Sequence, residues 1–351
     1  MARKKRKGHY SGIGGQAVLE GIMMKNKDKY SVAVRTPSGD IDVTLEEYDS
    51  FTPSKTLLKI PFVRGIFNFI DSMILGIRTL NYSATFYEEE DKSREKARRD
   101  KNYKGKQKEK LFDRIFGDNA DKVLSVITVL VSLVFAIVLF MLVPYFLSQA
   151  FRMVIVNNTV IAILEGILRV LIFVIYVVAI SKMNDIKRVY KYHAAEHKCI
   201  NCLETGHILN VSNVRRASRL HKRCGTSFMF FVVFVSIILF MFIRVEDPVM
   251  RVIIRLLLLP VIAGISYEII RLAGKSNNII IKILSAPGMM LQRLTTCELD
   301  GAETSKGDES GKRYGDDDII EVAIAAVDAV FDWREYLINE FHYDPNDIYQ
   351  Q

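Results

Sequence analysis

A glutamate and two histidines near the middle of the chain have the types and spacing of a metal-dependent hydrolytic site. Residues 192–198 read YHAAEHK, which contains the pattern H-x-x-E-H. On a helix, His193 and His197 lie one turn apart on the same face, where two imidazole nitrogens can bind one tetrahedral metal ion. Glu196 follows three positions after His193, so its carboxylate can act as a general base, as in inverzincin peptidases. The alternative is that two histidines on an amphipathic helix are simply polar surface.

A second pair of ligand types, His221 and Cys224, follows at a spacing of three positions. Four of the six histidines (193, 197, 207 and 221) and three of the four cysteines (199, 202 and 224) fall in this one segment. Packing does not explain such clustering, which indicates a site for zinc or another divalent metal. The expected ligands are His193, His197, Cys224, His221 and Cys202. Glu196 is the expected catalytic base, and Arg223 or His221 would stabilise a developing oxyanion.

A competing arrangement uses the cysteines instead. Cys199 and Cys202, together with His221 and Cys224, form a possible closed Cys₃His site. Such a site would be structural, because it leaves no open position for water. The spacing alone leaves both arrangements open.

The elements that position this segment are expected to be membrane helices. Half of the residues are hydrophobic, the mean hydropathy is +0.14, and charged and apolar residues are separated into blocks. Stretches of about 20 apolar residues can cross a bilayer. Four such stretches are predicted, at 125–147, 159–180, 226–243 and 249–272. The charged residues within them would either line a pathway or hold helices together, and the second interpretation is favoured: Glu165, Arg169, Arg255 and Glu268.

The net charge of +8 is concentrated before the first predicted span and in residues 182–223. Cytoplasmic loops carry an excess of Lys and Arg, so both termini and the central segment are predicted to be cytoplasmic in a multi-pass protein of the cell (plasma) membrane. Basic blocks beside apolar spans favour membrane lipids as partners over specific DNA.

The sequence therefore predicts a mainly α, polytopic membrane protein with about four transmembrane helices, interfacial amphipathic helices and a small cytosolic α+β unit. Alternation and turn residues predict the small β-unit, and residues 319–331 have the spacing of a helix that could pack on it. The expected segments are a basic tail and β-unit (1–54), an amphipathic interfacial helix (55–87), a charged linker (88–121), transmembrane helices 1–2 (122–180), the metal-site segment (181–225), transmembrane helices 3–4 (226–272), an interfacial segment with a Pro-Gly break (273–300), an acidic loop (301–318) and a C-terminal cytosolic helix (319–351).

Five blocks of the sequence resemble the DUF1385 family. They are GGQAVLEGIMM (14–24), KIPFVRGIFNFIDSMILGIRTLNYSA (59–84), HAAEHKCINCLETG (193–206), HKRCGTSF (221–228) and LQRLTTCELD (291–300). Bacterial members of that family are described as predicted metal-dependent membrane enzymes, so the resemblance implies a metal site at a membrane. It places the family's two site blocks on His193, Glu196 and His197 followed by Glu204, and on His221, Arg223, Cys224, Gly225 and Thr226. Similar proteins usually lack a cysteine at position 199, which counts against the closed Cys₃His site and leaves Cys202 as a fourth ligand.

Three function classes follow. The first is a membrane-embedded zinc-like hydrolase, with peptidases as one subclass, acting at the cytoplasmic membrane face. The second is a non-enzymatic membrane-insertion factor with a structural metal, which the basic residues 3–7 would help to associate with the translocon or the ribosome. The third, a transporter using the intramembrane charges, ranks last because four spans are few for that role.

Overall fold

The computed structural model describes residues 8–52, 57–99, 120–243, 245, 247–275, 278–299, 315–344 and 348. The predicted basic tail at 3–7, residues 100–119 of the predicted linker and residues 301–314 of the predicted acidic loop lie outside the described residues. The chain divides into two compact units. Unit 1 comprises residues 1–88, 179–232 and 260–351, and unit 2 comprises residues 89–178 and 233–259.

Unit 1 contains an antiparallel sheet that has four strands, in the order β1-β2-β3-β4, within the described part of the chain. The strands are β1 (Gly14–Val18), β2 (Gly21–Asn26), β3 (Lys29–Arg35) and β4 (Ile41–Glu47). Two-residue turns join the first three strands, and Glu20 and Lys27 adopt positive φ angles of 51° and 55° there. Tight hairpin turns require such angles because they must match the twist of the strands.

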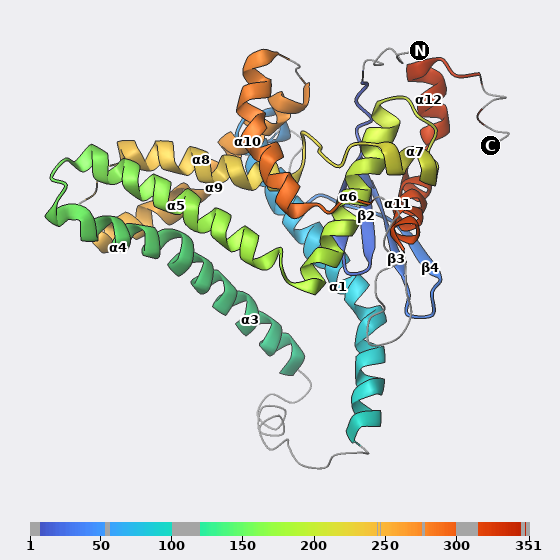
Figure 1. Ribbon diagram of the computed structural model, residues 1–351, viewed down its shortest axis with the longest axis horizontal. Coiled ribbons are helices and arrows are strands. Elements are labelled where there is room, and N and C mark those ends of the chain that lie inside the picture. Colours follow the sequence, from blue (N-terminus) through green and yellow to red (C-terminus); the bar gives the residue numbers. More distant parts are fainter. Residues whose placement is uncertain are drawn as a thin grey trace. The chain divides into compact units, whose positions relative to one another are not determined.

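Both faces of this sheet are covered, which follows from the alternation of apolar residues along β2 and β3 (Figure 1). Ile22, Met24 and Ala33 share a core with α6 (Asn184–Glu204) and α11 (Asp316–Val330). Met23 and Val32 face the other way, into a cluster with Leu75 of α1 (Val63–Arg99). Successive side chains of a strand point to opposite faces, so two helical layers can enclose one sheet.

The other helices that lie entirely in unit 1 are short or amphipathic. They are η1 (Leu57–Lys59), α7 (Val211–Arg216), α10 (Ile279–Thr295) and α12 (Trp333–Phe341). α10 continues through Pro287, where the sequence predicted a break. α1 extends to Arg99, so the beginning of the predicted linker is helical.

Among the described residues, four helical segments are long and apolar enough to cross a membrane, as predicted. The first, Ile127–Met153, combines α3 (Ala120–Ile137), the π-helix η3 (Val138–Leu142), α4 (Val143–Ala150) and the 3₁₀ turn η4 (Phe151–Met153). The others fall in α5 (Asn158–Ile180), α8 (Gly225–Phe242) and α9 (Pro248–Lys275). The predicted class, mainly α with about four candidate spans and a small sheet, is confirmed.

Of the four charged residues singled out within the spans, three pair with one another and the fourth, Glu268, pairs with α1. In unit 2, Glu165 accepts a hydrogen bond from Arg169 at 2.9 Å and forms an ion pair with Arg255 at 2.7 Å. Both guanidinium groups also lie over the ring of Phe240, at 5.2 and 4.8 Å from its centroid. In unit 1, Glu268 pairs with Arg64 of α1 at 2.5 Å. These contacts favour the interpretation that the charges hold helices together, and not the one in which they line a pathway.

Candidate metal centre

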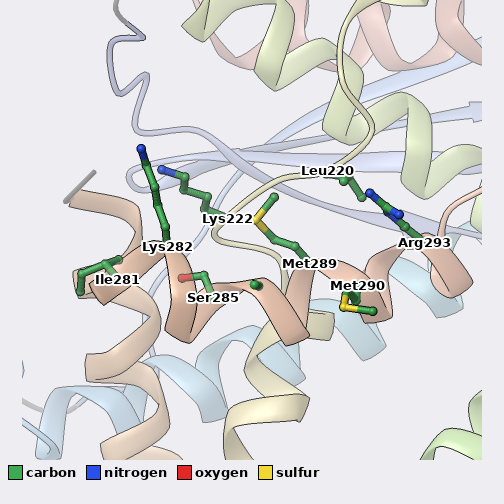
Figure 2. A pocket seen from close by; sticks show the side chains of 9 residues that line it. Leu220, Lys222, Ile281, Lys282, Ser285, Met289, Met290 and Arg293 are labelled. Carbon is green, nitrogen blue, oxygen red and sulfur yellow. The ribbon is translucent and has the colours of Figure 1, made fainter. Parts of the chain in front are cut away.

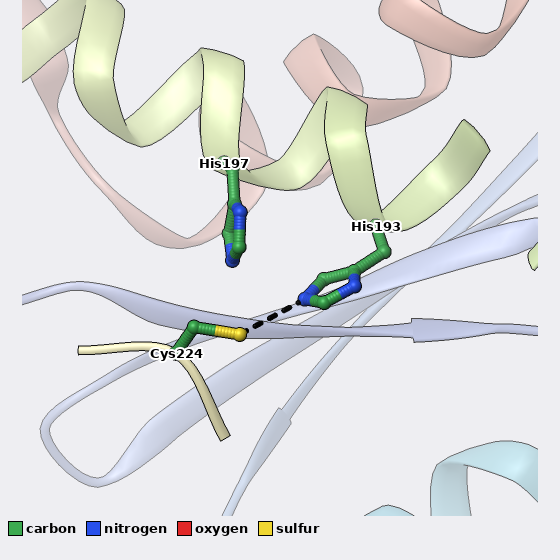
Figure 3. Close-up of side chains that lie close together, drawn as sticks. All are labelled: His193, His197 and Cys224. Carbon is green, nitrogen blue, oxygen red and sulfur yellow. Dashed lines mark hydrogen bonds between the residues drawn. The ribbon is translucent and has the colours of Figure 1, made fainter. Parts of the chain in front are cut away.

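Helix α6 positions the two histidines. One side of α6 is buried in the core of unit 1 through Ala195, Cys199 and Cys202, each at most 1% exposed. His193 and His197 point away from that core, and their ring centroids are 4.4 Å apart. The i,i+4 spacing thus has the predicted consequence: both rings project from one side of the helix (Figure 3).

The hydrogen bonds of the two rings determine which nitrogen is available. His193 Nδ1 donates to the carbonyl oxygen of Thr295 at 2.9 Å, and His197 Nδ1 donates to that of Arg219 at 2.6 Å. Because a carbonyl can only accept, each ring carries a proton on Nδ1, which leaves Nε2 as the nitrogen available to a metal. This is the orientation that metal-binding histidines use, with the other nitrogen bonded to a carbonyl.

Cys224 completes a group of three ligand atoms. Its Sγ lies 3.2 Å from His193 Nε2, and the ligand atoms of His193, His197 and Cys224 all lie within 4.8 Å of one another (Figure 3). Cys224 directly precedes α8, and the amide of Thr226 donates to its sulfur at 3.3 Å. A helix N-terminus stabilises a thiolate, which is the form that binds metals.

The loop that carries Cys224 is held on both sides. From α6, Asn201 donates to the carbonyls of Ser218 and Leu220, at 2.7 and 3.0 Å. From α10, the Gln292 side chain accepts from the amide of His221 at 2.8 Å and donates to its carbonyl at 2.7 Å. The sulfur is therefore located by backbone contacts to two helices that are far apart in the sequence.

Glu196 lies beside the ligand group and is 4% exposed. Its Oε2 is 3.5 Å from His197 Nε2. Burial raises the pKa of Glu196 to about 7, although His193, Arg223 and a hydrogen bond from the backbone of Gly15 act to lower it. A Cβ at Gly15 would come within 2.7 Å of Glu196 Cγ and 2.8 Å of the Met24 sulfur, so only glycine lets β1 approach this carboxylate so closely.

His221 and Arg223 belong to a neighbouring network centred on Glu204. Arg223 donates to Glu204 at 2.5 Å, and Ser11 donates to the same oxygen through its amide and its hydroxyl, at 3.0 and 2.9 Å. Burial acts to raise the pKa of Glu204, but His221, Arg223 and Ser11 outweigh it and lower the pKa to about 2. Burial also lowers the pKa of His221 to about 4. Its Nε2 is 3.9 Å from Glu204, too far for a hydrogen bond, and has no such partner among the described residues.

The structure does not bring Cys202 into the ligand group. On α6, at about 100° per residue, position 202 lies about 180° around the helix from His193. Cys199 and Cys202 are both in the hydrophobic core, and the sulfur of Cys202 contacts the carbonyls of His207 and Ile208 at 3.8 and 3.6 Å. Burial raises the pKa of Cys202 to about 12 and that of Cys199 well above its usual range. The geometry therefore does not match the closed Cys₃His arrangement.

The sequence interpretation missed the groups that orient the site, namely Gly15, Arg219, Gln292 and Thr295. Two of them act through backbone carbonyls, which any residue possesses, so residue type carries no signal for them. Gln292 has a weak signal, because it shares one face of the last turn of α10 with Thr295 and falls in the block 291–300 that resembles the family.

The donor set fits a zinc ion. Two imidazole nitrogens and one thiolate are ligands that zinc accepts, and three protein ligands leave a fourth position for water. Cys224 and His197 are buried, whereas His193 is partly exposed.

The fold and this site define a mainly α protein that has, within its described residues, four candidate membrane spans and a histidine–cysteine cluster in the unit that holds the sheet. A family model described as "Protein of unknown function (DUF1385)" matches residues 60–306, and the chain belongs to this family. The chain is 37% identical over 289 residues to the Bacillus subtilis (strain 168) protein named "Uncharacterized protein YqhQ", an alignment that covers 81% of this chain and 86% of that protein. No solved structure matches the chain.

Proposed function

We propose that this protein is a membrane-embedded, zinc-dependent hydrolase with its site at the cytoplasmic membrane face, and that peptides are its first substrate class to test. The ligands would be His193, His197 and Cys224. The observation that carries the proposal is the orientation of the two imidazoles, each tied through Nδ1 to a carbonyl, with both Nε2 atoms grouped with the sulfur of Cys224.

Zinc at this position would polarise a substrate carbonyl and lower the pKa of a bound water. Glu196 would take the proton from the attacking water and deliver it to the leaving group. Its burial and its contact with His197 support this role. Of the two residues expected to stabilise an oxyanion, His221 is better supported, because its Nε2 has no hydrogen-bond partner among the described residues whereas Arg223 is bonded to Glu204.

The substrate would be associated with the membrane. Cys224 immediately precedes α8, a candidate span. A site next to the first residue of a span lies within reach of the bilayer surface and of chains embedded in it.

Metal content tests the centre directly. Full-length protein purified in detergent without chelator should contain about one zinc per chain, and His193→Ala and Cys224→Ser should reduce zinc to background. Cys297→Ser is the matched control, since this thiol lies outside the ligand group. Cobalt-loaded protein should show a thiolate-to-metal absorption band that Cys224→Ser removes and Cys202→Ala retains. A wild-type protein that binds neither metal would refute the proposal.

Activity tests the role of Glu196. Quenched fluorescent peptides in mixed micelles are the probe, and Glu196→Gln should keep its zinc while the hydrolysis rate falls by about 10²–10⁴-fold. Equal rates in wild type and Glu196→Gln would rule out Glu196 as the base.

A structural metal in a non-enzymatic insertion factor is the second candidate. His197, Glu196 and Cys224 are only 1%, 4% and 5% exposed, so little of the centre is open to a substrate, which favours a structural metal. For this candidate, a chelator should lower the unfolding temperature, and no hydrolytic activity should be found with or without it. The protein should also co-purify with ribosomes or the translocon in a salt-sensitive way. Association that does not change with salt would contradict it.

A further inference from the structure

A cavity of about 410 Å³ lies between the loop before Cys224 and helix α10 (Figure 2). The loop contributes Leu220 and Lys222, and α10 contributes most of the remaining lining, including Lys282, Ser285, Met289 and Arg293. None of the three candidate metal ligands lines it. It is therefore a separate site in unit 1, adjacent to the centre through a shared loop.

The charges around this cavity have one sign. Lys222, Lys282 and Arg293 line it, and none of its nine lining residues is acidic. Figure 2 shows the ammonium groups of Lys222 and Lys282 near each other at one end, with Arg293 toward the other. Like charges this close repel each other. An anion between the two lysines would relieve that repulsion.

A buried hydroxyl provides an independent observation. Ser285 is 5% exposed, it lines the cavity, and its Oγ has no hydrogen-bond partner among the described residues. Unsatisfied buried polar groups are rare, because each costs about 1–3 kcal/mol. A ligand oxygen in the cavity would satisfy this hydroxyl.

The remaining lining is apolar, which favours a lipid over a small soluble anion as the ligand. Ile281, Ala286, Met289 and Met290 form the other walls. On the same helix, Ile279, Ile283, Met290 and Leu294 are exposed and share one stripe. An apolar stripe beside a basic one is the pattern of a helix lying at the surface of an anionic bilayer.

We propose that this cavity binds one anionic phospholipid. The phosphate contacts Lys222, Lys282 and the hydroxyl of Ser285, and the first part of an acyl chain lies along Met289 and Met290. The volume is within the range of sites for small ligands. The proposal does not depend on metal binding, so zinc content and lipid binding can fail separately.

The test titrates full-length protein in detergent with three probes: dihexanoyl phosphatidylglycerol, dihexanoyl phosphatidylcholine and inorganic phosphate. The anionic lipid should bind at least about tenfold more tightly than the zwitterionic one, and phosphate should not displace it. The double variant Lys222→Gln with Lys282→Gln should weaken binding about twenty-five-fold, since each cation near a membrane surface contributes about fivefold.

Matched variants separate this site from general surface charge. Lys29→Gln with Lys187→Gln removes the same charge at exposed positions outside the cavity and should leave affinity unchanged. Ala286→Trp fills the cavity without changing charge and should weaken binding at least about tenfold, whereas Ile283→Trp on the exposed stripe should not.

Three results would overturn the proposal: equal affinity for the two lipids, full displacement by phosphate, or equal losses in the cavity variants and their controls. Zinc content is measured on every variant and should stay at the wild-type level.

Discussion

The centre around His193 and the charge cluster around Glu165 are both buried and polar, but their polar atoms are satisfied in different ways. In the Glu165 cluster of unit 2, the carboxylate contacts two guanidinium groups, and Arg169 also donates to the carbonyl of Phe140. The groups that face inward are one another's partners. A cluster of this kind is complete without a ligand.

In the centre of unit 1, Nδ1 of each imidazole donates to a backbone carbonyl, whereas His193 Nε2 lies 3.2 Å from Cys224 Sγ and His197 Nε2 lies 3.5 Å from Glu196 Oε2. The inner atoms, two Nε2 and one Sγ, face one another. When these three atoms carry no proton, all of them are electron-pair donors, and a metal cation would satisfy them together. Both clusters are buried, and they differ in the chemistry of their groups: the Glu165 cluster joins opposite charges, whereas the His193 centre joins three groups that can all bind a metal ion.

The largest expected effect comes from breaking the complete cluster. Glu165→Gln should lower the free energy of unfolding by about 3–5 kcal/mol, because it leaves buried guanidinium groups without their counter-charge. Thermal unfolding in detergent measures this. Replacing Glu165, Arg169 and Arg255 together by leucine should restore most of the stability. If the triple variant is as unstable as the single one, pairing does not explain the cluster.

A smaller effect is expected where β1 approaches the centre. Gly15→Ala should cost about 1–3 kcal/mol, since the added methyl overlaps Glu196 and Met24. Chemical denaturation compares it with Gly14→Ala, whose added Cβ meets nothing within 4 Å. Equal stabilities of the two variants would show that β1 does not constrain Glu196.

The loop that carries Cys224 should respond more weakly still. Asn201→Ala removes two side-chain hydrogen bonds to this loop and should cost about 1 kcal/mol, because water can reach part of the freed carbonyls. If the loop locates the sulfur, zinc affinity should fall as well, which competition with a chromophoric chelator measures. Unchanged affinity would mean that the hydrogen bonds of Asn201 do not locate the sulfur.

The smallest change in stability is expected for an exposed ion pair. Arg78 and Glu46 are 3.0 Å apart, with side chains 59% and 42% exposed. Arg78→Gln should change stability by at most about 1 kcal/mol, and by less at high salt, because water screens such pairs. A loss as large as that of Glu165→Gln would remove the distinction between buried and exposed charges.

The spans and the histidine pair could be predicted from sequence because both depend on local features. An uncharged stretch such as 125–147 is long enough by itself to form a span, and the i,i+4 spacing of His193 and His197 defines a helix face. The same helical geometry places Cys202 on the far side of α6. Cys202 was predicted as a ligand from its nearness in the sequence, without considering that a helix directs it away from His193.

The remainder depends on contacts between distant segments. Thr295 is 102 positions from His193, and Gln292 is 71 positions from His221, so no local pattern connects them. The strand β1 has the composition GGQAV, which carries little strand propensity. β1 nevertheless forms a strand because it pairs with β2 and because Gly15, which has no side chain, can approach Glu196 closely.

The hydrogen bond from His193 to the carbonyl of Thr295 also bears on biosynthesis. Chains emerge from the ribosome N-terminus first, so α6 is made well before the segment that orients its histidine. The same delay applies to the sheet, whose face toward Ile22 and Ala33 is covered by α11, a helix that begins only at Asp316. A chain truncated before α11 would keep its candidate spans and its ligand residues, yet it would expose the apolar side of the sheet and become a substrate for quality-control proteases.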